Sequence, residues 1–293
     1  MSVPVLVLFL SSVGWGLTWL PLKYLNAHGM QGPVLVLVAF AAAALVLLPA
    51  FIRQRRSWAG QVRFLLLIAL FGGFANLSFQ IALYEGEVIR VMILFYLLPV
   101  WSVLGGRMFL GERIDRLRMV TVAMALLGAF LILGGFAVFG TQTGWVDMLA
   151  IASGLAFAMN NIVFRATQTL PVTSKVAAVF VGCAVLVGGY LAVSQPVASV
   201  YTPATMLLTV LYGVAWLTPI TFGTQWGVTR LEAGRASIII IMELVTAVIS
   251  AGLLLGETLS AGELAGGLLV VGAVLVETLR EASLPQPAAP ERV

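Results

Sequence analysis

Residues 33–52 read PVLVLVAFAAAALVLLPAFI, an apolar run that contains no charged residue. Twenty helical residues rise about 30 Å, which is the thickness of the hydrocarbon core of a bilayer. Only helices and closed barrels cross membranes, because lipid offers no hydrogen-bond partner to the backbone. The run is continuous rather than alternating, so it predicts a membrane-spanning helix and not a strand of a barrel.

The whole chain shares this apolar character. It has 293 residues, of which 61% are apolar and 10% are charged, whereas soluble proteins average roughly 45–50% and 25%. This composition excludes a water-soluble enzyme, a nucleic-acid-binding protein and a disordered protein as descriptions of the whole chain. A single cysteine, Cys183, and a single histidine, His28, exclude a disulfide framework and a His-rich metal site. We expect no metal, no cofactor and no enzymatic activity.

The apolar runs predict an all-α integral membrane protein with ten transmembrane helices. The predicted helices span 3–22, 33–52, 64–84, 90–110, 118–138, 145–164, 175–194, 204–226, 236–255 and 263–280. The links between them are short and leave no room for a soluble domain. The tail, residues 283–293, is rich in proline and alanine and is expected to be disordered.

The positive charges predict the orientation of these helices, because Lys and Arg concentrate in cytoplasmic links. With the N-terminus placed inside, fourteen of the sixteen fall on the cytoplasmic side, and only Lys23 and Arg90 fall outside. Both termini are therefore predicted to be cytoplasmic. We interpret Lys23 and Arg90 as long side chains that reach toward the membrane interface.

One short motif occurs twice. Leu110-Gly111-Glu112 follows the fourth predicted helix, and Leu255-Gly256-Glu257 follows the ninth. The chain is therefore predicted to consist of two five-helix repeats, residues 1–140 and 141–282, arranged around a central cavity. Because five is an odd number, the second repeat crosses the membrane in the opposite sense to the first. Inverted repeats of this kind occur in secondary transporters, with the substrate bound near the midplane.

The starts of the two halves also correspond. Trp15-Gly16-Leu17-Thr18, followed by Lys23, matches Phe157-Ala158-Met159-Asn160, followed by Arg165. With the ten helices and the doubled Leu-Gly-Glu motif, this stretch resembles the EamA-type members of the drug/metabolite transporter superfamily, which include bacterial amino-acid exporters. The resemblance covers nearly the whole chain except the tail, and it implies export of small metabolites through the bacterial inner membrane. The second copy has Phe157-Ala158 where Trp-Gly is expected, so the two halves of the cavity are not expected to be chemically equivalent.

Polar residues inside the apolar helices have to face other helices or water, because an unpartnered polar group in hydrocarbon costs several kcal/mol. They recur at helical spacing on six predicted helices, the first, third, fourth, sixth, eighth and ninth. We predict that these helices line the cavity and bind substrate through Trp15, Thr18, Asn76, Gln80, Tyr84, Tyr96, Trp101, Phe157, Asn160, Trp216, Gln225 and Glu243. Packing between helices for Asn and Gln, and an interfacial belt for Trp and Tyr, stay open as alternatives.

Glu243 is the residue of this set that gives the most specific functional hypothesis. It lies about 10 Å into the ninth predicted helix at 1.5 Å per residue. An intramembrane carboxyl group is a functional hypothesis by default, here for proton coupling or for attraction of a substrate amine. The alternative is a glutamate that is protonated or amide-paired and serves helix packing. The pairs Gly252/Gly256 and Gly262/Gly266 are predicted to be packing faces.

The predicted lining combines amides, hydroxyls and aromatic rings with few fixed charges. It favours neutral zwitterions or aromatic compounds over phosphates, which call for Arg clusters. The chain contains no G-x-x-x-x-G-K-[ST] motif, so no ATP binding of that type is expected. We predict a secondary transporter that exports small metabolites, aromatic or neutral amino acids, by alternating access, with possible proton coupling. The alternatives are a passive channel or facilitator, an exporter of another metabolite or drug class, and a membrane enzyme or scaffold.

Overall fold

The computed structural model describes residues 2–30, 32–86, 88–135, 144–194, 201–255 and 259–283, which form helices and turns and no strand. The elements before residue 136 are α1 (Val3–Gly16), α2 (Trp19–Ala27), α3 (Gly32–Arg53), α4 (Arg55–Trp58), η1 (Ala59–Gln61), α5 (Val62–Glu85), α6 (Val88–Phe95), α7 (Leu98–Leu110) and α8 (Arg116–Ile132). Those after residue 143 are α9 (Trp145–Ala166), α10 (Val172–Ser194), α11 (Pro203–Leu211), η3 (Tyr212–Leu217), α12 (Thr218–Arg230), α13 (Ala233–Ile240), α14 (Met242–Leu255) and α15 (Ala261–Ser283).

Nine helical stretches of the described chain are long and apolar enough to cross a membrane. They overlap nine of the ten predicted spans, so the chain is an all-helical, multi-pass membrane protein. The predicted fifth span corresponds to α8, whose 17 residues stand at the lower end of the length that crosses a bilayer. The last three residues of that prediction, 136–138, lie outside the described parts, as does the tail 284–293.

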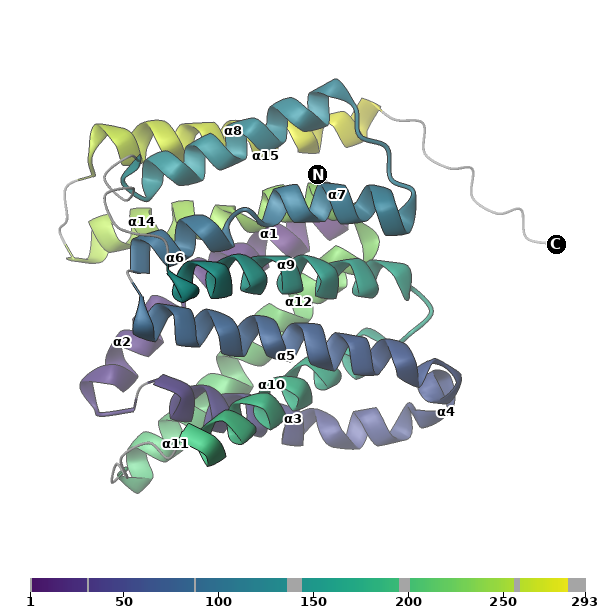
Figure 1. Ribbon diagram of the computed structural model, residues 1–293, viewed down its shortest axis with the longest axis vertical. Coiled ribbons are helices and arrows are strands. Elements are labelled where there is room, and N and C mark those ends of the chain that lie inside the picture. The colour runs from purple at the N-terminus through teal and green to yellow at the C-terminus, as the bar shows by residue number, and fades with distance from the viewer. Residues whose placement is uncertain are drawn as a thin grey trace.

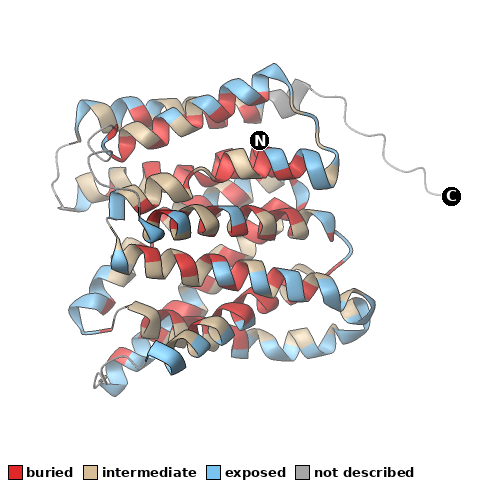
Figure 2. Cartoon of the chain, viewed as in Figure 1, coloured by how far each residue is buried: buried red, intermediate tan, exposed pale blue. Residues whose placement is uncertain are grey.

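The outside of the bundle is covered by apolar side chains. Val193 is 86% exposed and Leu253 is 81% exposed. In Figure 2 the buried residues concentrate between the helices, whereas the exposed ones lie on their outward sides. Leaving such side chains in water costs roughly 25 cal/mol per Å² of apolar surface, a cost that a hydrocarbon environment removes.

Four of the spanning segments are irregular near their middle. The first breaks at Leu17–Thr18 between α1 and α2, the fourth at Tyr96–Leu97 between α6 and α7, and the ninth at Ile241 between α13 and α14. The eighth contains the π-helix η3. A proline follows three of these points at Pro21, Pro99 and Pro219, where its ring would clash with the carbonyl four residues earlier.

The helices pack in pairs across the boundary between the first and second halves of the chain. α1 lies against α12, α5 against α9, α3 against α10, and α8 against α15. Figure 1 shows the pair α8 and α15 at one edge of the stack and α3 with α10 toward the opposite edge.

Glycines bring the pair α8 and α15, and also α5 and α10, close together. A Cβ atom added at Gly266 of α15 would lie 2.5 Å from the carbonyl oxygen of Gly128 in α8. The packing role predicted for Gly266 is thereby confirmed. A Cβ atom at Gly182 of α10 would lie 2.0 Å from the carbonyl oxygen of Ala69 in α5, so this helix pair also requires glycine.

Candidate functional site

Two tryptophans join α1 and the turn after it to the eighth span. The Trp15 indole donates a hydrogen bond to Thr224 Oγ1 at 3.2 Å. In return, the indole of Trp216 in η3 donates to Thr18 Oγ1 at 3.1 Å. Three of these residues were predicted as site residues, and the fourth, Thr224, was not. The two bonds hold the N-terminal segment against the region where the eighth span departs from α-helical geometry.

Three amides meet where α9 faces α12. Asn161 Oδ1 accepts the side-chain amides of Asn160 at 3.4 Å and of Gln225 at 3.5 Å. All three side chains are buried, with 3% exposure or less. Because both NH₂ groups converge on one oxygen, Asn160 Oδ1 and Gln225 Oε1 point away from it, and no described residue donates to either. The cluster therefore has acceptor capacity that the protein does not use.

The third span approaches this cluster through a glycine. A Cβ atom at Gly72 of α5 would lie 3.0 Å from Asn160 Oδ1. One turn further, Asn76 donates its amide to the Gly72 carbonyl at 2.8 Å, so its polar group is satisfied within its own helix. Gln80 is half-buried on the next turn. The side chain of Tyr84 lies outside the described parts of the structure.

The breaks of the fourth and ninth spans meet through Tyr96 and Glu243. Tyr96 lies in the break between α6 and α7, and its hydroxyl donates to Glu243 Oε1. Glu243 lies in the first turn of α14, directly after the break at Ile241. The first span is also close at this level, since a Cβ atom at Gly16 would lie 2.5 Å from the Glu243 carbonyl oxygen.

Aromatic rings surround the Tyr96 side of this contact. The Phe95 ring lies 5.4 Å from the Tyr96 ring, edge to face, and 5.8 Å from the Phe157 ring. The Phe79 ring of α5 lies 4.5 Å from Phe95 on another side. Phe157 precedes Asn160 by three residues in α9, so both share one face of that helix. The rings therefore extend from Tyr96 to the face of α9 that carries Asn160.

These contacts join five of the six helices that were predicted to carry the site, and the third span approaches them through Gly72 and Phe79 of α5. We call the set the polar layer, and it comprises Trp15, Thr18, Tyr96, Phe157, Asn160, Asn161, Trp216, Thr224, Gln225 and Glu243. Trp101 is half-buried in α7, and no described residue accepts a hydrogen bond from its indole nitrogen. Sequence reasoning omitted Asn161 and Thr224 from the site, although each adjoins a residue that it included.

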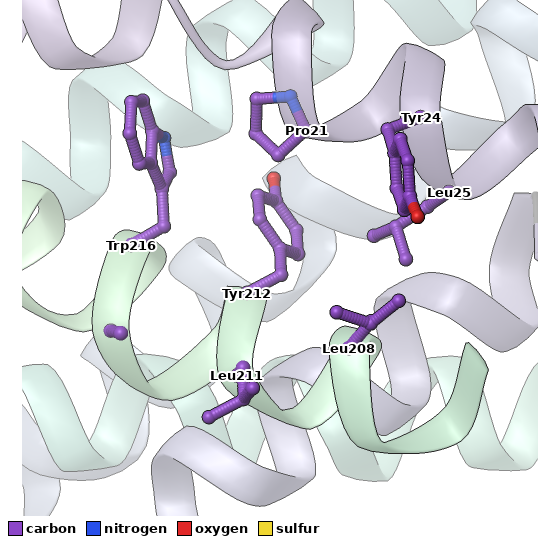
Figure 3. Close-up of a pocket in the computed structure, with 8 residues that line it drawn as sticks. Pro21, Tyr24, Leu25, Leu208, Leu211, Tyr212 and Trp216 are labelled. Carbon is purple, nitrogen blue, oxygen red and sulfur yellow. The ribbon is translucent and has the colours of Figure 1, made fainter. Parts of the chain in front are cut away.

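A cavity of about 260 Å³ lies beside the polar layer, between α2 and the start of the eighth span. Tyr212 and Trp216 extend from η3 toward Pro21 and Tyr24 of α2 (Figure 3). Its walls are apolar and aromatic, with Leu208 at one side. Of the predicted site residues, Trp216 lines it, so the cavity reaches the polar layer at this side chain.

One charged contact joins the first half of the chain to α9. Arg90 Nε donates to Asp147 Oδ1 at 2.7 Å, and Arg90 Nη2 donates to Asp147 Oδ2 at 2.6 Å. The two side chains are 15% and 8% exposed. Arg90 is therefore held in an ion pair with a carboxylate of the second half, in addition to its predicted place near the interface.

A second group of charges crosses between the halves at the other end of the fourth span. Arg118 pairs with Glu232 and, through Nε at 3.3 Å, with Glu277. Glu112, from the first Leu-Gly-Glu motif, accepts the Ala233 backbone N–H at the start of α13. Its carboxylate also lies 3.9 Å from Arg165. Burial raises the pKa of Glu112 above its ordinary value, and the bond from Ala233 opposes this shift.

Comparison with known proteins agrees with this architecture. The model of the EamA-like transporter family matches the chain twice, over residues 2–134 and 144–278. A protein of Streptantibioticus cattleyicolor named "Probable terminal-alkyne amino-acid exporter" is 28% identical over 97% of this chain and 98% of its own length. A protein crystal structure superposes with a TM-score of 0.77, at 18% identity, over 96% of this chain and 99% of that one. This last likeness shows the fold alone.

Proposed function

The chain belongs to the EamA-like transporter family, and from this premise we propose that it exports neutral and aromatic amino acids by alternating access. The observation that carries the proposal is the polar layer, in which side chains from five spans of both halves meet inside an otherwise apolar bundle. Polar side chains at this depth are costly in lipid and mark substrate pathways. The printed name of the relative from Streptantibioticus cattleyicolor supports amino acids as the substrate class.

The two halves act as inverted repeats in this proposal, with α8 as the fifth of ten spans. The helix pairing supports it, because exchanging the halves turns the pair α1 and α12 into the pair α9 and α5. The broken helices support it as well. Tyr96 and Ile241 stand at the breaks of the fourth and ninth spans, and they are separated by the same offset as Glu112 and Glu257.

Alternating access needs contacts between the halves that can form and break. The ion pairs of Arg90 and of Arg118 each join a residue of the first half to one of the second, as does the contact of Glu112 with Arg165. By the distribution of Lys and Arg, Arg118 and Glu112 are at the cytoplasmic end and Arg90 is at the opposite end. We propose a bacterial inner-membrane location with both termini cytoplasmic.

A proton gradient is the energy source that fits the residues of the layer. Glu243 is the carboxyl group of the layer, and a Tyr96 hydroxyl holds one of its oxygens. Carboxyl groups at this depth serve as proton relays in pumps and transporters. In this proposal Glu243 carries the proton, and an imposed pH gradient drives export.

The test is transport of labelled phenylalanine by the purified full-length protein in liposomes, with and without a pH gradient. Asn160→Leu and Gln225→Leu are expected to reduce the initial rate at least about tenfold, since each removes a buried polar group from the layer. Asn26→Leu, on the exposed end of α2, is the matched control and should leave the rate unchanged. Transport without saturation or counterflow stimulation would indicate a channel, and wild-type rates in both variants would overturn the proposed site.

A further inference from the structure

Glu243 has no cationic partner among the described residues, unlike Asp147, Glu277 and Glu112. Asp147 is paired with Arg90, Glu277 with Arg118, and Glu112 lies near Arg165. None of the ion pairs in the described chain includes Glu243. Its only hydrogen-bond partner there is the Tyr96 hydroxyl, which occupies Oε1 and leaves Oε2 unused. A carboxylate at this depth needs a counter-charge to be stable.

The surroundings of Glu243 suit a cation better than an anion. Tyr96 contacts it, the Phe95 ring packs against Tyr96, and the Phe157 ring packs against Phe95; ring faces attract ammonium groups. The unused atoms of the amide cluster are the acceptors Asn160 Oδ1 and Gln225 Oε1. All of these groups complement N–H donors.

Two basic side chains of the described residues near the amide cluster, Lys175 and Arg165, are already engaged by oxygen atoms of the protein. Lys175 is fully buried, but its ammonium is engaged with the carbonyls of Phe164 and Thr167 at 2.9 and 3.1 Å and with Thr229 Oγ1 at 3.1 Å. Arg165 donates to the Thr229 carbonyl at 3.2 Å. The indole of Trp101 is a neutral donor.

We propose that Glu243 binds the ammonium group of the exported molecule as its counter-charge, so that the substrate class is primary amines, with a carboxylate permitted but not required. The inference rests on the proposed function and deepens it. The ammonium pairs with the unused Oε2, the Tyr96 hydroxyl keeps Oε1 in place, and the aromatic rings receive the apolar remainder of the molecule. Compounds that retain the carboxylate but lack the amine are excluded, because they would place a second negative charge beside Glu243.

The experiment compares three probes on the purified full-length protein by their effect on its thermal unfolding. Phenylalanine carries both groups, phenethylamine lacks the carboxylate, and 3-phenylpropionate lacks the amine. Phenylalanine and phenethylamine are expected to raise Tm at concentrations within about tenfold of one another, whereas 3-phenylpropionate should need at least about tenfold more. Stabilisation by 3-phenylpropionate equal to that by phenethylamine, or none by either amine, overturns the inference. This comparison needs no variant.

Glu243→Gln is expected to abolish stabilisation by both amines. Glu85→Gln, on the exposed end of α5, is the matched control and should retain it. Phenylalanine transport in liposomes that is equal in Glu243→Gln and wild type overturns the ammonium site and the proton role of Glu243, and leaves amino-acid export standing. Absence of phenylalanine transport by the wild-type protein, with amine binding intact, overturns the proposed amino-acid export alone.

Discussion

Arg90 and Asp147 form a two-point ion pair that joins α6 to the first turn of α9. Asp147 Oδ2 also accepts the Gly144 backbone N–H at 3.0 Å, which caps the start of α9. The carboxylate thus satisfies a helix end and neutralises a guanidinium of the other half at the same time. Arg90 and Asp147 lie near the ends of the fourth and sixth spans, and residues of the polar layer lie further along the same spans.

Asp147→Ala should therefore destabilise the protein by roughly 3–5 kcal/mol, because it removes both hydrogen bonds of this largely buried ion pair and the cap of α9. Unfolding of the purified protein in mixed micelles measures this change. The double variant Arg90→Asp with Asp147→Arg re-forms a pair and should recover part of the loss. Equal stability of Asp147→Ala and wild type would show that water or lipid headgroups replace the pair.

The two acids that pair with Arg118 should respond very differently to neutralisation. Glu277 is 1% exposed and also accepts the Thr121 hydroxyl at 2.7 Å, whereas the Glu232 side chain is 44% exposed. Glu277→Gln should cost about 3 kcal/mol or more, as expected for a broken buried pair. Glu232→Gln should cost about 1 kcal/mol or less, because solvent screens the exposed charge. The unfolding free energies of the two variants, measured side by side, test this order, and the reverse order would contradict it.

Two glycines of α10 provide a matched test of helix packing. A Cβ atom at Gly182 would lie 2.0 Å from the Ala69 carbonyl oxygen, whereas one at Gly189 would meet nothing within 4 Å. Gly182→Ala should destabilise by about 1–3 kcal/mol, because α10 has to move away from α5. Gly189→Ala should be neutral or stabilise by up to about 1 kcal/mol, because alanine favours the helix. Similar melting temperatures for both variants would contradict the close approach of α5 and α10.

The fold was accessible from the sequence because long charge-free runs such as 33–52 have only one stable form in lipid. The positions of the nine helical stretches of the described residues that are long and apolar enough to cross a membrane follow from that rule. Their interruptions do not all follow from it. Pro21, Pro99 and Pro219 give a local reason for three of them, whereas the break at Ile241 has no such residue and depends on contacts that only the folded bundle provides.

The sequence predicted which helices carry the candidate site, but it did not predict which side chains contact one another there. Helical spacing places Trp15, Asn160 and Gln225 on inward faces, because a polar side chain within a membrane needs a polar partner from another helix or from water. Helical spacing does not indicate which residue forms a hydrogen bond with each of these side chains, so Thr224 and Asn161 were missed. Arg90 and Asp147 lie 57 positions apart in the chain, and no local pattern connects them. Such pairs arise from how helices of the two halves are placed together.

Glu112 should make the stability of the protein depend on pH in the acidic range. Burial and the nearby Glu232 raise the pKa of Glu112, whereas Ala233, Arg165 and Arg118 lower it, with burial the largest influence. A carboxyl group whose pKa is raised on folding contributes stability that is present below its unfolded value of about 4.3 and is lost as pH rises through the raised value. The Glu112→Gln side chain cannot ionise. As pH falls across that window, the Tm of the wild type should therefore rise relative to the Tm of this variant. Glu263→Gln, on an exposed helix start, is the control, and a pH-independent difference for Glu112→Gln would contradict the raised pKa.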